Sequence, residues 1–381
     1  MKQYDYIICG AGAAGLSLLM HLMQNKVFDD KTILVIDKST KHSNDRTWCF
    51  WEQQPGIFEP IVQHSWQQVH FYSSYYSGLL HLQPYTYKMI RGIDFYNYVL
   101  KEASARPNIS FITGNVQALA NEVNIARVLV DGESYTAPYL FNSIMLNRPS
   151  IPANKYFLLQ HFKGWLIETT YPAFEDGKAT LMDFRVSQHN GTTFVYVLPL
   201  SPNKALVEYT LFTRNTLEMQ AYDTALKDYI GKYLSIAKFK VVEEEYGIIP
   251  MTNINFPRHE GRIINIGTAG GQTKASSGYT FNFIQKHIRT IVQRLLSNQS
   301  PVAEGSFFER RFKLYDSTLL NILHNKKLGG DRIFADLFKK NEPSRVLRFL
   351  DNESSFEDEI NIMGSLPSQV FMKAALQEIF R

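Results

Sequence analysis

Three glycines near the start of the chain have the spacing that a dinucleotide-binding turn requires. Gly10, Gly12 and Gly15 follow an apolar run at 6–9 in the pattern G-x-G-x-x-G, and an apolar helical stretch at 16–23 comes next. In such a turn the first glycine permits the tight bend, the second lets a pyrophosphate approach the backbone, and the third lets the helix pack against the strand. The N-terminus of that helix offers unpaired N–H groups and a positive dipole to the phosphates.

An acidic residue stands where such a site needs one. Asp37 ends a second apolar strand at 32–36, about twenty residues beyond the glycines, where a carboxylate can bind ribose hydroxyls. Because strand, helix, second strand and acid occur in order, the sequence favours a dinucleotide site over a glycine-rich turn that binds nothing. Ala13, Ala14 and Lys38, which adjoin the glycines and the aspartate, are predicted to belong to the same site.

A second strand, turn and helix occur late in the chain. The apolar run 262–266 leads into Gly267 and a segment that contains Gly270 and Gly278, before a helix predicted at about 280–296. A plain nicotinamide domain needs only one such turn, whereas flavoproteins of the glutathione-reductase-like group bring a second one to the flavin. The two turns therefore favour FAD over NAD as the bound dinucleotide.

The middle of the chain has the alternating pattern of antiparallel strands. The predicted elements are strands at 163–169, 179–184, 192–198 and 204–212 and a helix at 217–233. We expect these strands to form a separate sheet that carries a substrate pocket.

The predicted fold class is therefore α/β. It is a glutathione-reductase-like FAD-binding Rossmann domain with an inserted antiparallel-sheet substrate domain and a helical C-terminal region. The FAD-binding domain is predicted to be discontinuous, over residues 1–60, 90–149 and 251–300. The substrate-binding domain is predicted to comprise 61–89 and 150–250, and the helical region 301–381.

Composition argues against several other classes. The chain has 381 residues and a net charge of only +4, which does not suggest a nucleic-acid partner. Its two cysteines and ten histidines show no metal-ligand spacing, so no metal is predicted. No run of eighteen apolar residues and no signal peptide is present, so we expect no transmembrane helix. The expected location is the cytoplasmic side of a membrane, with peripheral contact only.

Two C-terminal stretches are candidates for that contact. Residues 307–323 and 333–350 combine apolar stripes with arginines and lysines, and a basic amphipathic helix can lie on an anionic membrane surface. The alternative is that these helices cap a core and leave their charges in water.

Several motifs together resemble the bacterial lycopene beta-cyclases of the flavin-dependent type, and the likeness runs over nearly the whole chain. The motifs lie at 4–15, 45–49, 90–95, 160–165, 182–183, 196–201, 205–210, 266–270 and 277–280. The resemblance implies FAD that is active in its reduced form, with NAD(P)H as the reductant. It implies lycopene and other acyclic carotenes as substrates, and closure of their ends to beta-ionone rings, which yields gamma-carotene and beta-carotene. Arg46 and Arg91, within two of the motifs, are predicted to contribute to the cofactor site.

The resemblance also implies that Glu208 is the acidic residue on which ring closure depends. Strand alternation places Glu208 on one face with Leu206 and Thr210, and a carboxyl group desolvated by apolar neighbours can act as an acid. From its neighbours alone, the sequence slightly favours an exposed strand residue at Glu208. Asp183 matches a family position too, and is predicted to be a second acid or an orienting group; the alternative is a strand-end carboxylate bonded to backbone N–H groups.

Two positions depart from the family pattern. A second carboxylate often follows the catalytic glutamate, and here that place is Tyr209. Related flavoproteins usually carry an aspartate where this chain has Thr268, so backbone donors and the helix dipole are expected to hold this part of the flavin.

Aromatic residues could stabilise a passing cation beside the acid. The candidates are Trp48, Trp51, Trp165 and Tyr196, although core packing is the commoner role for any single one. Other functions compatible with the sequence are a flavin monooxygenase or polyprenyl reductase, and a non-catalytic isoprenoid-binding escort protein. The escort hypothesis predicts decayed glycines and a lost Asp37, and both are intact.

Overall fold

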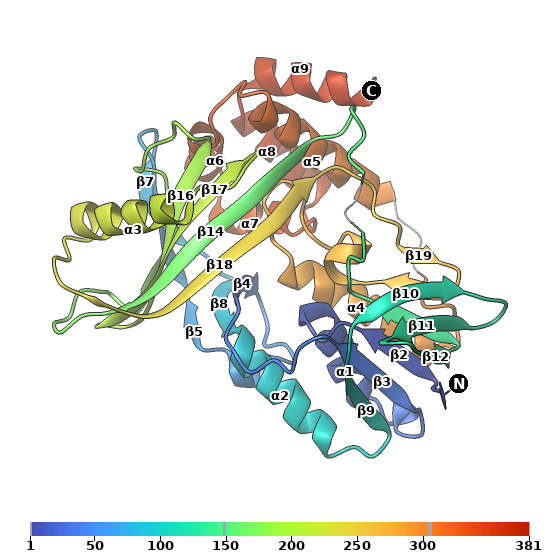
Figure 1. The fold of residues 1–381 in the computed structure, drawn as a ribbon. Helices are drawn as coiled ribbons and strands as arrows, with labels where there is room; N and C mark the ends of the chain where they lie inside the picture. Colours follow the sequence, from blue (N-terminus) through green and yellow to red (C-terminus); the bar gives the residue numbers. More distant parts are fainter. Residues whose placement is uncertain (1, 148–149, 303–306, 381) are drawn as a thin grey trace.

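A parallel sheet of short apolar strands forms the centre of the N-terminal part of the molecule (Figure 1). The computed structural model describes residues 2–147, 150–302 and 307–380. In spatial order the strands are β19 (His259–Glu260), β20 (Ile263–Asn265), β13 (Tyr139–Asn142), β2 (Tyr6–Cys9), β3 (Ile33–Asp37) and β9 (Ile109–Thr113). Every neighbouring pair is parallel except β19 with β20, so this is the predicted dinucleotide-binding type of sheet.

Two layers cover this sheet because successive side chains of a strand point to opposite faces. Ile8 and Val35 pack against a layer of helices, whereas Ile7 and Leu34 pack against a second sheet. The helices are α1 (Ala13–Met23), α2 (Gly92–Ser104) and α4 (Phe281–Leu296). The second sheet has the order β1 (Lys2–Gln3), β12 (Glu133–Ala137), β11 (Ala126–Val130) and β10 (Val116–Asn121). Short 3-10 turns lie at η1 (Lys26–Phe28), η2 (Glu59–Ile61) and η3 (Gly267–Gly270).

A seven-stranded sheet forms the other half of the molecule (Figure 1). In spatial order its strands are β18 (Lys240–Thr252), β14 (Phe157–Glu168), β17 (Lys204–Thr213), β16 (Thr192–Ser201), β15 (Lys178–Asp183), β6 (Gln68–Tyr72) and β7 (Ser77–His81). All neighbouring pairs are antiparallel except β15 with β6. The four predicted strands are confirmed, with β14 beginning at Phe157, and α3 (Met219–Tyr233) covers one face. The long edge strand β18 was not predicted.

A small sheet connects the two halves. Its strands are β4 (Thr47–Glu52), β8 (Thr86–Arg91) and β5 (His64–Trp66). Trp48 of β4 packs edge-on against Phe95 of α2, and Phe50 stacks on Phe281 at the start of α4. The aromatic segment after the first nucleotide-binding unit therefore fastens the second glycine turn to the N-terminal core.

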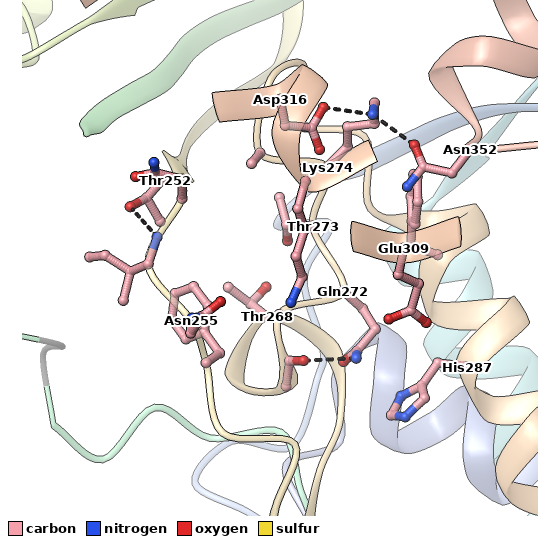
Figure 2. A pocket seen from close by; sticks show the side chains of 18 of the residues that line it. Thr252, Asn255, Thr268, Gln272, Thr273, Lys274, His287, Glu309, Asp316 and Asn352 are labelled. Carbon is pink, nitrogen blue, oxygen red and sulfur yellow. Dashed lines mark hydrogen bonds and ion pairs between the residues drawn. The ribbon is translucent and has the colours of Figure 1, made fainter. Parts of the chain in front are cut away.

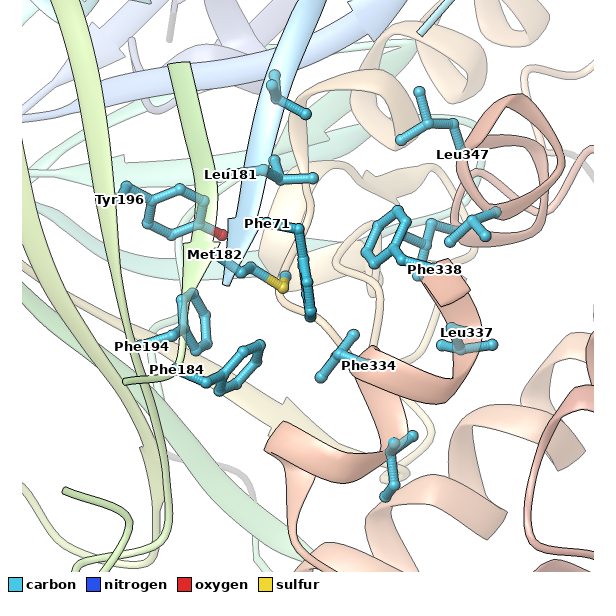
Figure 3. Close-up of a cluster of buried hydrophobic side chains, with 14 of the residues drawn as sticks. Phe71, Leu181, Met182, Phe184, Phe194, Tyr196, Phe334, Leu337, Phe338 and Leu347 are labelled. Atoms are coloured by element: carbon cyan, nitrogen blue, oxygen red, sulfur yellow. The ribbon is translucent and has the colours of Figure 1, made fainter. Parts of the chain in front are cut away.

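The C-terminal helices pack on the seven-stranded sheet, on the face opposite α3. They are α5 (Phe307–His324), α6 (Gly330–Lys340), α7 (Pro343–Leu350), α8 (Phe356–Ser365) and α9 (Ser368–Ile379). Figure 3 shows Phe334 and Phe338 of α6 against Phe71 of β6 and Phe184, which follows β15; the ring centroids of Phe71 and Phe338 are 5.1 Å apart.

This packing corrects the prediction that residues 307–323 and 333–350 contact a membrane. Among the described side chains, the apolar stripes of 307–323 and 333–350 face the core, so they are not available to a lipid surface. The alternative prediction, that these helices cap a core, is confirmed. Within the described residues no helix is long and apolar enough to cross a membrane.

Candidate active site

A cavity of about 510 Å³ lies where the seven-stranded sheet, the small sheet and the second glycine turn meet. Aromatic and apolar side chains dominate the part of its wall that surrounds Glu208. They include Cys49, Tyr87, Tyr196, Leu198, Leu206 and Tyr279. Thr268 of the second glycine turn and Gly278 also line this cavity, so the predicted cofactor turn and the predicted acid open into one space.

Glu208 lies on the cavity face of β17, as the strand alternation predicts. Val207 and Tyr209 point the other way, into the core beneath α3. Burial raises the pKa of the Glu208 carboxyl well above its usual range, and the charge of Glu245 raises it further. The Thr210 hydroxyl donates a 2.8 Å hydrogen bond to Oε1 of Glu208, which opposes the shift only in part. This environment favours the protonated form of Glu208, which is the form that an acid catalyst needs.

Glu245 of β18 is a functional candidate that the sequence motifs did not indicate. In the sheet register Gly164 of β14 pairs with Glu208 on one side and with Glu245 on the other. The two carboxyl groups therefore stand on the same face, with only a glycine between them. A Cβ at Gly164 would lie 3.0 Å from Cγ of Glu245 and 3.1 Å from Cδ1 of Leu206, so a larger residue would crowd the pair.

Glu245 was not predicted as a site residue because it is the last of three consecutive glutamates. Such a segment resembles a run of charged side chains in solvent. Strand alternation separates them: Glu244 points outward and forms an ion pair with Lys163 at 3.0 Å, whereas Glu245 is only 8% exposed. Recognising 240–252 as a strand in register with β14 would have revealed this difference.

Asp183 does not join Glu208, which corrects the expectation of a second acid. It is fully buried, and its pairing partner Val195 belongs to the core beneath α3, on the face of the sheet away from the cavity. Arg185 binds both of its oxygens, with Nε 2.9 Å from Oδ1, and the Tyr229 hydroxyl donates to Oδ2 at 2.7 Å. Asp183 thus anchors α3 to the sheet.

Only some of the aromatic residues predicted to stabilise a cation line the cavity. Trp48 and Tyr196 line the cavity. Trp51 is buried next to it, with its ring centroid 4.6 Å from that of Tyr279. Trp165 belongs to the core beneath α3 and faces away from the cavity.

The first glycine turn has the shape of a phosphate cradle. Gly10 has a φ of +97°, and a Cβ on Gly15 would lie 1.9 Å from the Gly10 carbonyl oxygen, so both positions require glycine. A Cβ on Gly12, in contrast, would meet nothing within 4 Å. The start of α1 has no side-chain cap, which leaves its first N–H groups free for a phosphate.

The other residues predicted to bind the cofactor near this turn differ in how closely they approach it. Asp37 is fixed at the end of β3, where its Oδ2 accepts a 2.7 Å hydrogen bond from the Ala11 N–H. Lys41 approaches the same carboxylate at 3.2 Å, whereas Lys38 is exposed. Ala13 and Ala14 open α1 directly behind Gly12. The turn therefore fits the pyrophosphate and ribose of a dinucleotide.

The second turn lies against the first. Gly267 has a φ of +62°, and a Cβ there would lie 2.7 Å from the Cβ of Ala14. Gly278 has a φ of +74°, and a Cβ there would lie 1.9 Å from Oε1 of Gln160, a buried oxygen without a hydrogen-bond donor. A long ligand such as FAD can therefore extend from the first turn, past Gly267, into the Glu208 cavity.

The remaining cofactor candidates lie near this path or belong to ion pairs. Gly270 sits in η3, where a Cβ would lie 2.2 Å from the Asn265 carbonyl oxygen. Arg46 lines the Glu208 cavity and pairs with Asp45 at 2.9 Å. Arg91 pairs with Glu243 at 3.4 Å and lines a small cavity beside Glu245.

A second cavity, of about 530 Å³, lies on the other side of the second glycine turn and shares Thr268 with the first. Figure 2 shows the buried Lys274 between Asp316 of α5 and Asn352, each 2.7 Å from its Nζ. These contacts fasten the loop between Gly267 and α4 to the C-terminal helices. The helical region therefore fixes the loop that carries Gly278.

The fold identifies a class of proteins. A geranylgeranyl bacteriochlorophyll reductase-like protein from Thermoplasma acidophilum superposes with a TM-score of 0.63 at 13% identity, covering 98% of both chains. A flavin-dependent brominase superposes with a TM-score of 0.60 at 12% identity, covering 98% of this chain and 94% of the other. These likenesses concern the fold alone, which this chain shares with a reductase-like protein, a flavin-dependent brominase and a p-nitrophenol 4-monooxygenase.

Sequence comparison then identifies the family. A family model described as lycopene cyclase protein matches residues 5–376, so the chain belongs to the lycopene cyclase family. A lycopene beta-cyclase of Pantoea ananas is 28% identical over 261 residues, 65% of this chain and 63% of that protein. A chloroplastic neoxanthin synthase of Solanum tuberosum is 24% identical over 301 residues, 73% of this chain and 57% of that protein. The matched segments thus span less than two thirds of these relatives.

Proposed function

We propose that this protein is a lycopene beta-cyclase that closes the acyclic ends of lycopene to beta-ionone rings, giving gamma-carotene and beta-carotene. The observation that carries the proposal is Glu208: a partly buried carboxyl with a raised pKa in a largely apolar and aromatic cavity next to the second glycine turn. Family membership supports the same conclusion.

The reaction needs an acid, an apolar pocket and a base. The Glu208 carboxyl gives its proton to the terminal alkene, so that its O–H bond breaks, a C–H bond forms and a tertiary carbocation results. The neighbouring double bond attacks the cation and forms the ring C–C bond. A ring carbon then loses a proton to a carboxylate, which leaves the ring alkene. No electrons are gained or lost overall, and the product is an isomer of the substrate.

Other cavity residues suit the cationic intermediate. The faces of Trp48 and Tyr196 can each stabilise a nearby cation by roughly 0.5–2 kcal/mol, most strongly where water is excluded. The apolar side chains of Leu198 and Leu206 in the wall disfavour water, which would otherwise capture the cation. When bound, reduced FAD supplies an electron-rich, negatively charged ring system beside the pocket, and NAD(P)H is the proposed reductant that maintains it.

A peripheral membrane contact is also part of the proposal, because an all-carbon polyene partitions into lipid. The large apolar side chains exposed on the last two helices are candidates for this contact. Phe356 and Ile360 lie on one face of α8, and Met372, Leu376 and Phe380 on one face of the α9 segment; each is more than half exposed. We propose that these faces rest on the cytoplasmic side of a membrane.

The test of the function is expression in cells that accumulate lycopene, followed by pigment analysis. Appearance of carotenes with beta-ionone rings is the expected result. A monooxygenase acting on an isoprenoid would add oxygen, a polyprenyl reductase would add hydrogen, and both would consume NAD(P)H in proportion to product. A non-catalytic escort protein would bind lycopene and leave it unchanged.

A further inference from the structure

We propose that Glu245 is the carboxylate partner of Glu208, and that the two side chains hold one proton between them, with Glu208 as the neutral acid toward the substrate. This inference rests on the proposed cyclisation, and it assigns a positioning residue that the sequence motifs did not indicate.

Sheet geometry carries the first step of the argument. Glu208 and Glu245 occupy the same cross-strand row, and Gly164 stands between them on β14. Neighbouring strands lie about 5 Å apart, and two residues on either side of a third strand are separated by about 10 Å at the backbone. Two glutamate side chains can reach toward each other over a glycine but not over a larger residue, and each carboxyl acts on the pKa of the other.

The partners of the two carboxyl groups show which one is the acid. Oε2 of Glu245 accepts a 2.7 Å hydrogen bond from the Thr47 hydroxyl, and the positive charge of Arg46 acts on the same carboxyl. Its Oε1 is buried without an ordinary donor, so a protonated Glu208 is the neighbour that supplies one. Only Glu208 of the two lines the large cavity. Burial raises the pKa of Glu245 as well, but Thr47 and Arg46 oppose that rise, so we place the negative charge on Glu245 and the proton on Glu208.

A route for proton exchange leads away from the cavity. Glu243 lies on the same face of β18 as Glu245, and its side chain is 38% exposed and 3.4 Å from Arg91. Glu243 and Glu245 both line the small cavity beside the pair. After Glu208 has given its proton to the alkene, we expect Glu243 to be the neighbour through which the pair regains a proton from solvent.

Four other ionisable groups near the pair, one thiol and three phenols, release their protons less readily than the carboxyls do. Cys49 of β4, Tyr87 of β8, Tyr196 of β16 and Tyr279 face Glu208 from the surrounding elements, and burial raises the pKa of each. These four groups stay neutral over the range in which the carboxyl pair titrates. Asp45, Arg46 and Glu243 also lie near the pair, so a pH-dependent signal is assigned to Glu208 and Glu245 by its loss or shift in the variants of these two residues.

The test uses the purified protein without substrate, in infrared difference spectra recorded during a pH titration. We expect a carbonyl band from a protonated carboxylic acid that persists at neutral pH in the wild-type protein and is absent in Glu208→Gln. In Glu245→Gln the loss of the partner's charge should move the midpoint of this band's titration to a pH lower by about 1 or more. Glu245→Asp should titrate between the two, and Glu244→Gln, an exposed neighbour on the other face of β18, should titrate as wild type.

Activity provides the second readout. Ring formation by Glu245→Gln should decline at a lower pH than in the wild type and should approach the wild-type rate in acid. If the midpoint lies lower by about 1 on the pH scale, the rate at alkaline pH should be about tenfold lower. An unchanged titration in Glu245→Gln or Glu245→Asp, or a protonated-acid band that survives in Glu208→Gln, would overturn the pairing. A wild-type protein that shows the shared proton but forms no rings would instead contradict the proposed function, so the two failures are distinguishable.

Discussion

Gly267 and Ala14 touch, so the two glycine turns of the chain form one surface. A Cβ on Gly267 would lie 2.7 Å from the Cβ of Ala14, although the two residues belong to opposite ends of the nucleotide-binding domain. Gly12 lies beside this contact with open space in front of it, and Thr268 beyond it lines the Glu208 cavity. A single long ligand can therefore connect the phosphate cradle with the acid.

The first prediction concerns that ligand. Gly12→Val should fold, because a Cβ there meets no protein atom within 4 Å, but the side chain should fill the space of the pyrophosphate. We expect the purified wild-type protein to carry non-covalent FAD and the variant to lack it, measured by visible absorbance. Gly177→Val is the matched control, since that glycine also faces open space and lies in a loop outside both turns. A fully loaded Gly12→Val protein would refute this assignment.

The second prediction concerns Glu208. Glu208→Gln is nearly isosteric, so it should keep the fold and the FAD, but it has no proton to transfer. General acid catalysis contributes about a hundred- to ten-thousand-fold in rate, and ring formation should fall by a factor in that range. Product is measured by chromatography of the carotenes. Activity near the wild-type level would remove Glu208 from the mechanism.

The third prediction is the pH dependence that follows from Glu208. Burial and the charge of Glu245 raise the pKa of this carboxyl, and the protonated form is the active one. Activity should therefore be fully present below the raised pKa and decline as the pH rises through it. A rate profile of the wild-type enzyme, with flavin kept reduced throughout, checks the sign. Activity that instead rises with pH would mean that the carboxylate form is required.

The fourth prediction separates Asp183 from the chemistry. Asp183→Asn leaves Arg185 without its buried carboxylate and weakens the hydrogen bond from Tyr229, so unfolding free energy should fall by about 1–3 kcal/mol. The protein that remains folded should form rings at the wild-type rate per bound FAD. Denaturant unfolding and turnover, measured on the same preparation, test both statements. A large loss of turnover without a loss of stability would restore a catalytic role for Asp183.

The fifth prediction concerns the membrane. Replacing Met372 and Leu376 of α9 with glutamate puts charges in the proposed lipid contact, and should reduce flotation with anionic liposomes at low salt. Val123→Glu is the control, since Val123 is 89% exposed but lies in the nucleotide-binding half. Equal flotation of all three proteins, or no flotation of the wild type, would exclude α9 as the contact.

Local patterns were sufficient to predict most of the fold. Glycine spacing predicted the first turn because the tight bend at Gly10 and the close packing of Gly15 are properties of a few adjacent residues. The alternation along β17 placed Glu208 on the correct face for the same reason. The order of the strands within each sheet was not predicted.

The features that could not be predicted from the sequence depend on contacts between distant segments. Glu245 becomes special only because β18 pairs with β14 in a register that sets it opposite Gly164, and nothing local to the three glutamates reveals that register. The C-terminal stripes were ambiguous because an apolar helix face suits a core and a membrane equally well. Asp183 matched a motif, but the bulge between β15 and β16 and its partner Arg185 direct it away from the cavity.

The central claim, an acid-initiated cyclisation without net redox change, is tested most directly by the mass of the product formed from lycopene in deuterated water. We expect an isomer of the substrate in which each new ring carries one deuterium, delivered by the acid. A product with added oxygen or added hydrogen, or a ring without deuterium, would contradict the account.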